Sequence, residues 1–182
     1  MKIGIFGGTF NPPHLGHLAA ARAAVDTLEL DRLLIIPAAT PPHKALPEDT
    51  PSRVDRLAMA KKLADALLMP DRVEVSYIEL DREGKSYTSV TLAQLREQYP
   101  DGELWLLMGT DMFLTLHQWH EPETILKLAG VCAFGRAQQD GEEVFAPQLE
   151  HLSKTFPGAR LTTIALPGLV YLSSTRLREM LA

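Results

Sequence analysis

Short apolar runs alternate with segments of helical periodicity along this 182-residue chain. The apolar runs, each a candidate buried strand, fall at residues 2–6, 33–36, 73–75, 104–108, 131–134 and 161–164. Between them, apolar residues recur at helical spacing, which predicts helices over residues 15–30, 52–67, 88–95, 121–128, 144–155 and 174–181. Strands that alternate with helices form βαβ units, whose strands run parallel. The sequence therefore predicts one Rossmann-like α/β domain over residues 1–182, with a mostly parallel, doubly wound sheet and helices on both faces.

Composition and charge exclude several classes of protein. The formal net charge is −5 and no run of like charges stands out, so the chain lacks the basic surface of a nucleic-acid-binding protein. No stretch reaches the roughly 18 consecutive apolar residues of a membrane span. We expect no signal peptide, because the N-terminus passes directly into the first predicted strand. The single cysteine, Cys132, lies in a predicted strand and is expected to be a buried, inert thiol. We expect a cytoplasmic protein, with a homo-oligomer left open.

The junction between the first strand and the first helix is rich in residues that suit anion binding. Gly7 and Gly8 follow the strand and permit a tight turn and a close backbone approach to a ligand. His14 and His17 are three positions apart, so they project from one side of the first helical turn. Backbone N–H groups and the helix dipole attract an anion at such a position. We predict a phosphate site here.

The residues of this junction also suit two other roles, a helix cap and a zinc site. A histidine at the start of a helix is more often a cap or a solvated residue, but a pair of them after Gly-Gly favours a phosphate ligand. A zinc site is disfavoured, because no third ligand is suitably spaced nearby. The segment matches neither the P-loop nor the dinucleotide-binding glycine pattern.

The segment from Gly8 to His17, Gly-Thr-Phe-Asn-Pro-Pro-His-Leu-Gly-His, resembles the signature of the nucleotidyltransferases that carry a His-x-Gly-His motif. The resemblance implies that an acceptor attacks the α-phosphorus of ATP and releases pyrophosphate, with Mg²⁺ bridging phosphate oxygens. It assigns charge stabilisation at the phosphates to His14 and His17.

A second element near the C-terminus, Leu-Ser-Ser-Thr-Arg-Leu-Arg over residues 172–178, resembles the family's Ile-Ser-Ser-Thr-x-Ile-Arg. Taken alone, it is typical of a helix cap. Together with the first motif it implies a grip on the β- and γ-phosphates, with Arg178 as a catalytic residue. Gly109 and Asp111 match a Gly-x-Asp element, in which the carboxylate accepts ribose hydroxyls. The residues assigned to ATP binding are Gly7, Gly8, Thr9, Phe10, Gly109, Asp111, Ser173, Ser174 and Thr175.

Three further segments resemble those of bacterial nicotinate-nucleotide adenylyltransferases. Pro-Pro-His-Lys ends at Lys44, which would meet the mononucleotide phosphate. Ser-Tyr-Thr includes Tyr87 and Thr88, which would contact the nicotinate end, although a hydroxyl there also suits a helix cap. Trp119 would stack on the pyridine ring, where cation–π attraction is worth about 0.5–2 kcal/mol. The resemblance thus implies ATP and nicotinate mononucleotide as substrates.

Other functions stay open at this point. The acceptor could be nicotinamide mononucleotide or phosphopantetheine, and a non-catalytic nucleotide-binding module or a fragment of a tRNA synthetase is a weaker alternative. Two features depart from the family. Asn11 stands where the family more often has Asp, which removes a charge. The family also continues with one more helix after the second motif, so either the chain is shortened or this member lacks that helix.

Overall fold

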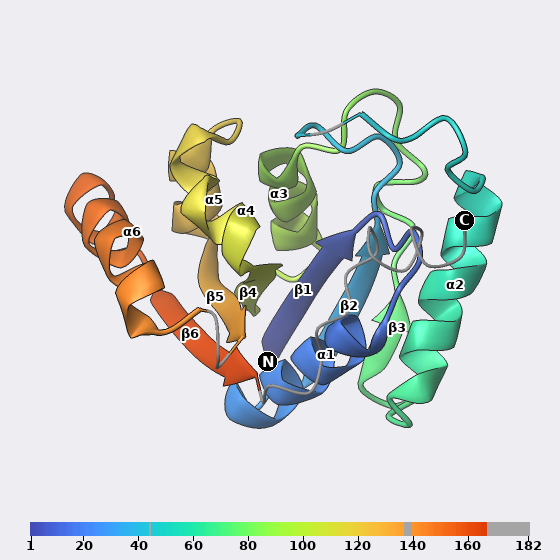
Figure 1. Cartoon of the computed structure of the whole chain (residues 1–182), viewed down its shortest axis with the longest axis horizontal. Helices are drawn as coiled ribbons and strands as arrows, with labels where there is room; N and C mark the ends of the chain where they lie inside the picture. The colour runs from blue at the N-terminus through green and yellow to red at the C-terminus, as the bar shows by residue number, and fades with distance from the viewer. Residues whose placement is uncertain (44, 137–139, 167–182) are drawn as a thin grey trace.

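Six strands form a single sheet in the computed structural model, and every neighbouring pair is parallel. The structure describes residues 1–43, 45–136 and 140–166. The strand order is β3-β2-β1-β4-β5-β6, with β1 at the centre, β2 and β3 on one side and β4 to β6 on the other (Figure 1). The strands are β1 (Lys2–Gly8), β2 (Arg32–Pro37), β3 (Val73–Val75), β4 (Glu103–Gly109), β5 (Ala129–Arg136) and β6 (Leu161–Leu166). This order is that of a doubly wound Rossmann fold, so the predicted fold class is confirmed.

Helices connect successive strands, as the alternation in the sequence predicts. They are α1 (Leu15–Thr27), α2 (Arg53–Ala66), α3 (Thr88–Gln98), α4 (Thr110–Leu114), α5 (Pro122–Leu128) and α6 (Glu142–Thr155), with a 3₁₀ turn, η1 (Leu116–Gln118). The five-residue α4 was not predicted, because a helix this short contains little more than one period of any pattern. Within the described residues, none of the helices has the length and apolar character needed to span a membrane.

Alternating side chains along each strand enter two different cores. On one face, Ile3 and Ile5 of β1 pack with residues of α3, α4, α5 and α6, whereas on the other face Phe6 packs with residues of α1 and α2. Consecutive residues of a strand point to opposite faces, so a strand buried on both faces must be apolar without interruption. This requirement explains the continuous apolar runs from which the strands were predicted.

The starts of two helices can be compared with the starts predicted from the sequence. Ser52 is the N-cap of α2 and its hydroxyl accepts the N–H of Asp55 at 3.1 Å, so α2 begins directly after the predicted first residue. The predicted start of α3 at residue 88 is confirmed, but the alternative of a hydroxyl cap is wrong for α3. Its N-cap is Tyr87, which makes no side-chain cap hydrogen bond, and Thr88 is the first residue of the helix.

Cys132 lies in the middle of β5 and is fully buried, as predicted. Burial raises the pKa of its thiol to about 12, because the thiolate would have no water around it. The thiolate is the reactive form of cysteine. This side chain is therefore protected from reaction because reagents cannot reach it and because its thiol stays protonated.

We therefore expect a thiol reagent such as DTNB to label the native protein at about pH 8 no faster than the protein unfolds. The rate of thionitrobenzoate release, compared with the unfolding rate from stopped-flow fluorescence, checks this. Protein unfolded in guanidinium should release one equivalent at once. Labelling of the native protein at the rate of a free thiol would contradict the buried position.

Candidate active site

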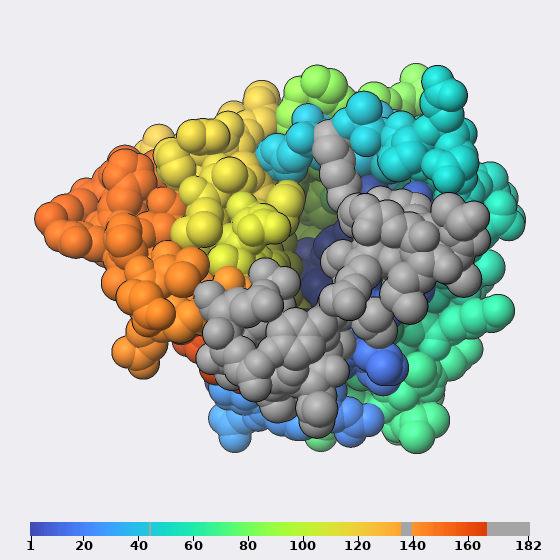
Figure 2. Space-filling view, viewed as in Figure 1, coloured from blue at the N-terminus to red at the C-terminus, as the bar shows by residue number. Residues whose placement is uncertain are grey.

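The loops that follow β1, β2, β3 and β4 gather at one edge of the sheet. Parallel strands all end at the same edge, and the registers place Gly8 of β1 beside Pro37 of β2. In the order β3-β2-β1-β4, the chain turns from one side of β1 to the other at this edge, which is where open α/β sheets bind ligands. Figure 2 shows a hollow in the surface that faces the viewer, with dark blue atoms of the N-terminal segment deep between the cyan and yellow atoms.

The chain bends after β1 at a different residue from the one predicted. Gly7 and Gly8 both belong to β1, and Phe10 is the residue in the left-handed region, with φ of 48°. Phe10 is 1% exposed, and its ring contacts the rings of Phe6 and His17 edge-on, at 5.8 Å and 5.3 Å between centroids. A side chain on Gly8 would come within 3.3–3.5 Å of the Phe10 ring, so the glycine leaves room for this packing.

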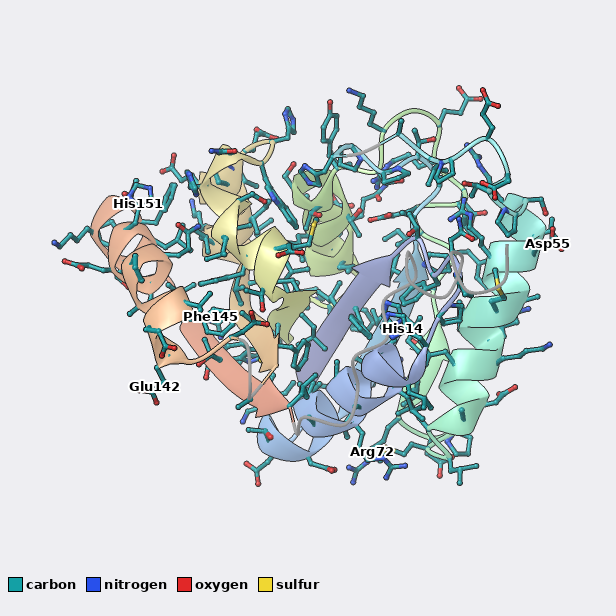
Figure 3. All side chains as sticks on the ribbon, viewed as in Figure 1. His14, Asp55, Arg72, Glu142, Phe145 and His151 are labelled. Carbon is teal, nitrogen blue, oxygen red and sulfur yellow. The ribbon has the colours of Figure 1, made fainter. Side chains whose placement is uncertain are left out.

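His14 and His17 cap the start of α1 reciprocally. His14 is the N-cap, and its Nδ1 accepts the N–H of Gly16 at 3.0 Å. His17 is the third residue of the helix, and its Nδ1 accepts the N–H of His14 at 3.0 Å. The two rings lie together, with 3.8 Å between centroids and 34° between planes. Figure 3 places His14 beside the start of α1, in front of the sheet. The two histidines can therefore cap the helix and still be available for the predicted phosphate site.

The capping bonds decide which atom of each ring can donate. A neutral imidazole whose Nδ1 accepts a hydrogen bond carries its proton on Nε2. Each ring thus has one N–H donor, at Nε2, on the side away from its capping bond. The predicted role of backbone N–H groups needs a correction here: Gly16 and His14 already donate theirs to the rings, so the imidazoles take over as donors.

Burial lowers the pKa of His14 below its ordinary value of 6.5. The charged ring would lose hydration in this half-buried position, and a proton on Nδ1 would also break the bond from Gly16. The neutral ring with Nε2–H is therefore the form that this structure favours near neutral pH.

Gly109 and Asp111 lie where β4 passes into α4. Gly109 is the N-cap of α4, and a side chain there would meet nothing within 4 Å, so the space in front of it is open. Asp111 is exposed in the first turn of that helix. Thr110 between them is buried and its hydroxyl donates to the carbonyl of Phe134 at 3.1 Å. The geometry leaves Asp111 accessible, and its contact with a ribose stays a prediction.

Two of the residues expected to bind the mononucleotide, Tyr87 and Trp119, each lie against the ring of a histidine. Tyr87 stacks on His120, with 4.2 Å between centroids, and Trp119 contacts the ring of His43 at 4.4 Å. Trp119 is 9% exposed and its indole N–H donates to the hydroxyl of Thr115 at 3.2 Å. These contacts join the loops after β2, β3 and β4 on one side of the phosphate site. Stacking of Trp119 on a pyridine ring stays a prediction.

The remaining predicted positions lie outside the described residues. They are Lys44, Ser173, Ser174, Thr175 and Arg178.

Arg56 is a residue that sequence reasoning missed. It belongs to α2, is 1% exposed, and donates to the backbone carbonyls of Thr9, Ala38 and Ala39. The sequence did indicate that Arg56 is buried, because Arg56 stands at helical spacing from the apolar Ala60 and Leu63, on the face that α2 buries. A charged residue on a buried helix face always needs partners, and these partners are in the loops of the site.

The pKa of His14 gives a prediction about stability and pH. Because the folded-state pKa lies below the unfolded value, the unfolded state binds more protons, and stability falls as the pH falls through that value. His14→Asn keeps an N-cap acceptor without a titrating ring. We expect the free energy of unfolding of the unmodified protein to fall relative to His14→Asn between about pH 7.5 and pH 5, across the ordinary histidine pKa. Urea unfolding at each pH measures this, and parallel profiles would contradict it.

Comparisons with known proteins identify the family. The model of the cytidylyltransferase-like family matches residues 5–180. A probable nicotinate-nucleotide adenylyltransferase of Exiguobacterium sibiricum is 37% identical over 183 residues, which cover 100% of this chain and 87% of that protein. One from Thermomicrobium roseum is 39% identical over 182 residues, covering 100% and 80%.

A solved structure shares the fold. The nicotinic acid mononucleotide adenylyltransferase of Plasmodium falciparum, complexed with NaAD, superposes with a TM-score of 0.77 at 17% identity, covering 100% of this chain and 84% of that one. At this identity the likeness concerns the fold alone. The sequence relatives carry the assignment further: the chain belongs to the cytidylyltransferase-like family and, within it, to the nicotinate-nucleotide adenylyltransferases.

Proposed function

We propose that this protein transfers the adenylyl group of ATP to nicotinate mononucleotide, giving deamido-NAD and pyrophosphate. A phosphate oxygen of the mononucleotide forms a bond to the α-phosphorus, and the bond from that phosphorus to the oxygen bridging the α- and β-phosphates breaks. The observation that carries the proposal is the pair of imidazole donors, His14 and His17, at the end of the central strand. The curated relatives bear the name of this activity over 80–87% of their own length.

The chemistry asks little of the protein beyond positioning and charge stabilisation. The acceptor is a phosphate monoester that is already anionic near neutral pH, so no strong general base is needed. Negative charge develops on the bridging oxygen and on the oxygens of the α-phosphate as pyrophosphate leaves. Preorganised donors aimed at such oxygens stabilise the transition state more than the ground state. The Nε2–H groups of His14 and His17 supply these donors.

Other residues complete the proposed site by their match to the family's motifs. The backbone around Thr9 and Phe10 contacts the triphosphate, and Asp111 accepts from the ribose. Ser173, Ser174, Thr175 and Arg178 hold the β- and γ-phosphates. Lys44 meets the phosphate of the mononucleotide, and Tyr87, Thr88 and Trp119 bind its nicotinate end.

Mg²⁺ enters this proposal together with ATP. The described residues contain no cluster of three His, Cys, Asp or Glu side chains that could hold a metal ion by themselves. Mg²⁺ commonly keeps several waters and binds through substrate phosphates. In this site the phosphate oxygens would hold the ion, which neutralises charge on the triphosphate, while the protein contributes the imidazole donors.

The direct test of the activity is pyrophosphate release from ATP with each acceptor supplied separately. We expect turnover with nicotinate mononucleotide to exceed that with nicotinamide mononucleotide and with phosphopantetheine. Each reaction is run with Mg²⁺ and repeated with EDTA, which should abolish turnover. Equal rates with the two pyridine mononucleotides would contradict the acceptor assignment. No pyrophosphate with any acceptor would favour a non-catalytic nucleotide-binding protein.

Replacement of His17 tests the role of the imidazole. His17→Ala should lower kcat by roughly 10²-fold or more, because a donor to the transition state is lost. His17→Gln should also lose activity, although its side-chain oxygen can still accept the N–H of His14 and keep the helix cap.

His151 on α6 offers a matched control, since it is exposed and lies at the far end of the molecule from His14 in Figure 3. His151→Ala should leave kcat unchanged. Circular dichroism of all three variants checks the fold. A loss below about threefold in His17→Ala would reduce His17 to a structural cap.

A further inference from the structure

The backbone that links β2 to the predicted mononucleotide loop is hydrogen bonded on every polar group. The segment Ala38–Thr40 precedes Pro41-Pro42-His43-Lys44 directly. The N–H of Ala38 donates to the carbonyl of Gly8 at 2.8 Å, which extends the pairing of β1 and β2 by one residue. The carbonyls of Ala38 and Ala39 accept from Nη1 and Nη2 of Arg56 at 2.6 Å and 3.3 Å.

Ser86 holds the opposite side of the same segment. Its hydroxyl oxygen accepts the N–H groups of Ala39 and Thr40, at 3.1 Å and 3.2 Å, and its own N–H donates to the carbonyl of Thr40 at 2.8 Å. Burial raises the pKa of the neighbouring Glu79 carboxyl, and the Ser86 side chain acts in the opposite direction. A single serine thus fixes two consecutive amides and one carbonyl of the segment.

Arg56 also reaches the loop that follows β1. Its Nη1 donates to the carbonyl of Thr9 at 3.3 Å, so one guanidinium links the phosphate loop to Ala38 and Ala39. The side chain is 1% exposed, its Nε has no partner, and no ion pair joins it to a carboxylate in the part of the chain that the structure describes. Burial and the nearby Arg53 lower its pKa, which shows how unfavourable this position is for a charge.

The cost of such a buried charge argues for a role beyond packing. An apolar side chain at this position of α2 would avoid the desolvation of a guanidinium, which hydrogen bonds to neutral carbonyls only partly offset. What an apolar side chain lacks is the planar fork of donors that holds several acceptors in one fixed geometry.

We propose that Arg56 and Ser86 form a positioning clamp that fixes Ala38–Thr40 relative to Thr9, and thereby sets the acceptor loop against the loop that holds ATP. The inference rests on the proposed function, since it concerns the alignment of the two substrates of that reaction. Neither side chain touches the reacting atoms. Both act through backbone segments that adjoin the residues predicted to contact the substrates.

The clamp has a distinct kinetic signature. In a transfer between two bound substrates, a displacement of one substrate by about 1 Å can lower the rate by roughly 10²-fold while each substrate keeps its own contacts. Loss of the clamp should therefore lower kcat much more than it weakens the binding of either substrate alone.

Arg56→Lys tests the clamp at the guanidinium. The lysine keeps the charge, but one ammonium cannot span the three carbonyls in the geometry of the fork. We expect kcat, per active enzyme, to fall by about tenfold or more, while the Kd values for ATP alone and for nicotinate mononucleotide alone change by less than about threefold. Ser86→Ala, which removes the acceptor of two amides and fills no new space, should give the same pattern.

Arg22 provides a matched control. It too donates to a backbone carbonyl, that of Leu67 at 2.8 Å, but this contact joins α1 to the end of α2 and involves none of the loops of the site. Arg22→Met should lower the thermal midpoint and leave kcat unchanged. If Arg56→Lys and Ser86→Ala behave like Arg22→Met, with lower thermal midpoints and unchanged kcat, the two residues only stabilise the fold and the clamp is overturned.

Amide exchange tests the clamp without any turnover. The N–H groups of Ala39 and Thr40 are bonded to the hydroxyl of Ser86, so both should be protected in the unmodified protein. We expect their exchange in deuterium oxide to be about tenfold faster or more in Arg56→Lys and Ser86→Ala, and unchanged in Arg22→Met.

The two measurements separate the two proposals. If the unmodified protein fails to use nicotinate mononucleotide but its protection of Ala39 and Thr40 depends on Arg56 and Ser86, the proposed function fails and the clamp remains. If the protein is active and protection is the same in all variants, the clamp fails and the function remains.

Discussion

The pairing of β1 with β2 on one side and β4 on the other is the constraint on which the whole site depends. Because the three strands are parallel, their carboxyl ends meet at one edge, and the loops that leave them must diverge there toward different faces of the sheet. The loop after β1 carries His14 and His17 into α1. Those after β2 and β4 carry the predicted acceptor and ribose contacts. Residues separated by more than a hundred positions in the sequence, such as Phe6 and Leu107, are thus neighbours where the strands end.

The hydrogen bonds of the histidine pair stabilise the start of α1 and also suit the proposed chemistry. The Nδ1 atoms of His14 and His17 satisfy N–H groups that the start of a helix would otherwise leave without partners. The same bonds fix the tautomer, so that each ring presents Nε2–H. An aspartate cap would also stabilise α1, but an ionised carboxylate would offer no donor. The two rings lie 3.8 Å apart between centroids, and burial lowers the pKa of His14, so the neutral form of that ring is the one favoured in the pair.

Local patterns predicted most of the fold, and they predicted that His14 and His17 lie on one side of the first turn of α1. Strands buried on both faces had to be continuously apolar, so their positions, the parallel sheet and the inert Cys132 followed from periodicity. Failures came where a short local pattern is ambiguous. Thr88 suits an N-cap by residue type, but Tyr87 takes that position. The glycines after β1 suit a turn, but the sheet extends through them and Phe10 bends the chain instead.

The contacts that join the loops could not be predicted in this way. Arg56 bonds to a residue 47 positions away, and Ser86 also to one 47 positions away. Sequence periodicity does not predict such a pairing, because the pairing depends on how α2 and the loop after β3 pack against the ends of the strands. A buried arginine on a helix face indicated that partners must exist, yet it could not indicate which carbonyls they are.

Asn11 illustrates how a departure from the family pattern fits its surroundings. Its side chain is 4% exposed, and Nδ2 donates to the hydroxyl of Thr50 at 3.4 Å, which draws the approach to α2 toward the phosphate loop. An ionised aspartate at this position has no proton to donate and would bring a buried negative charge close to a triphosphate. The neutral amide avoids both problems. In the proposed site, charge on the nucleotide would then be neutralised by Mg²⁺ and by donors on the protein, without a carboxylate at position 11.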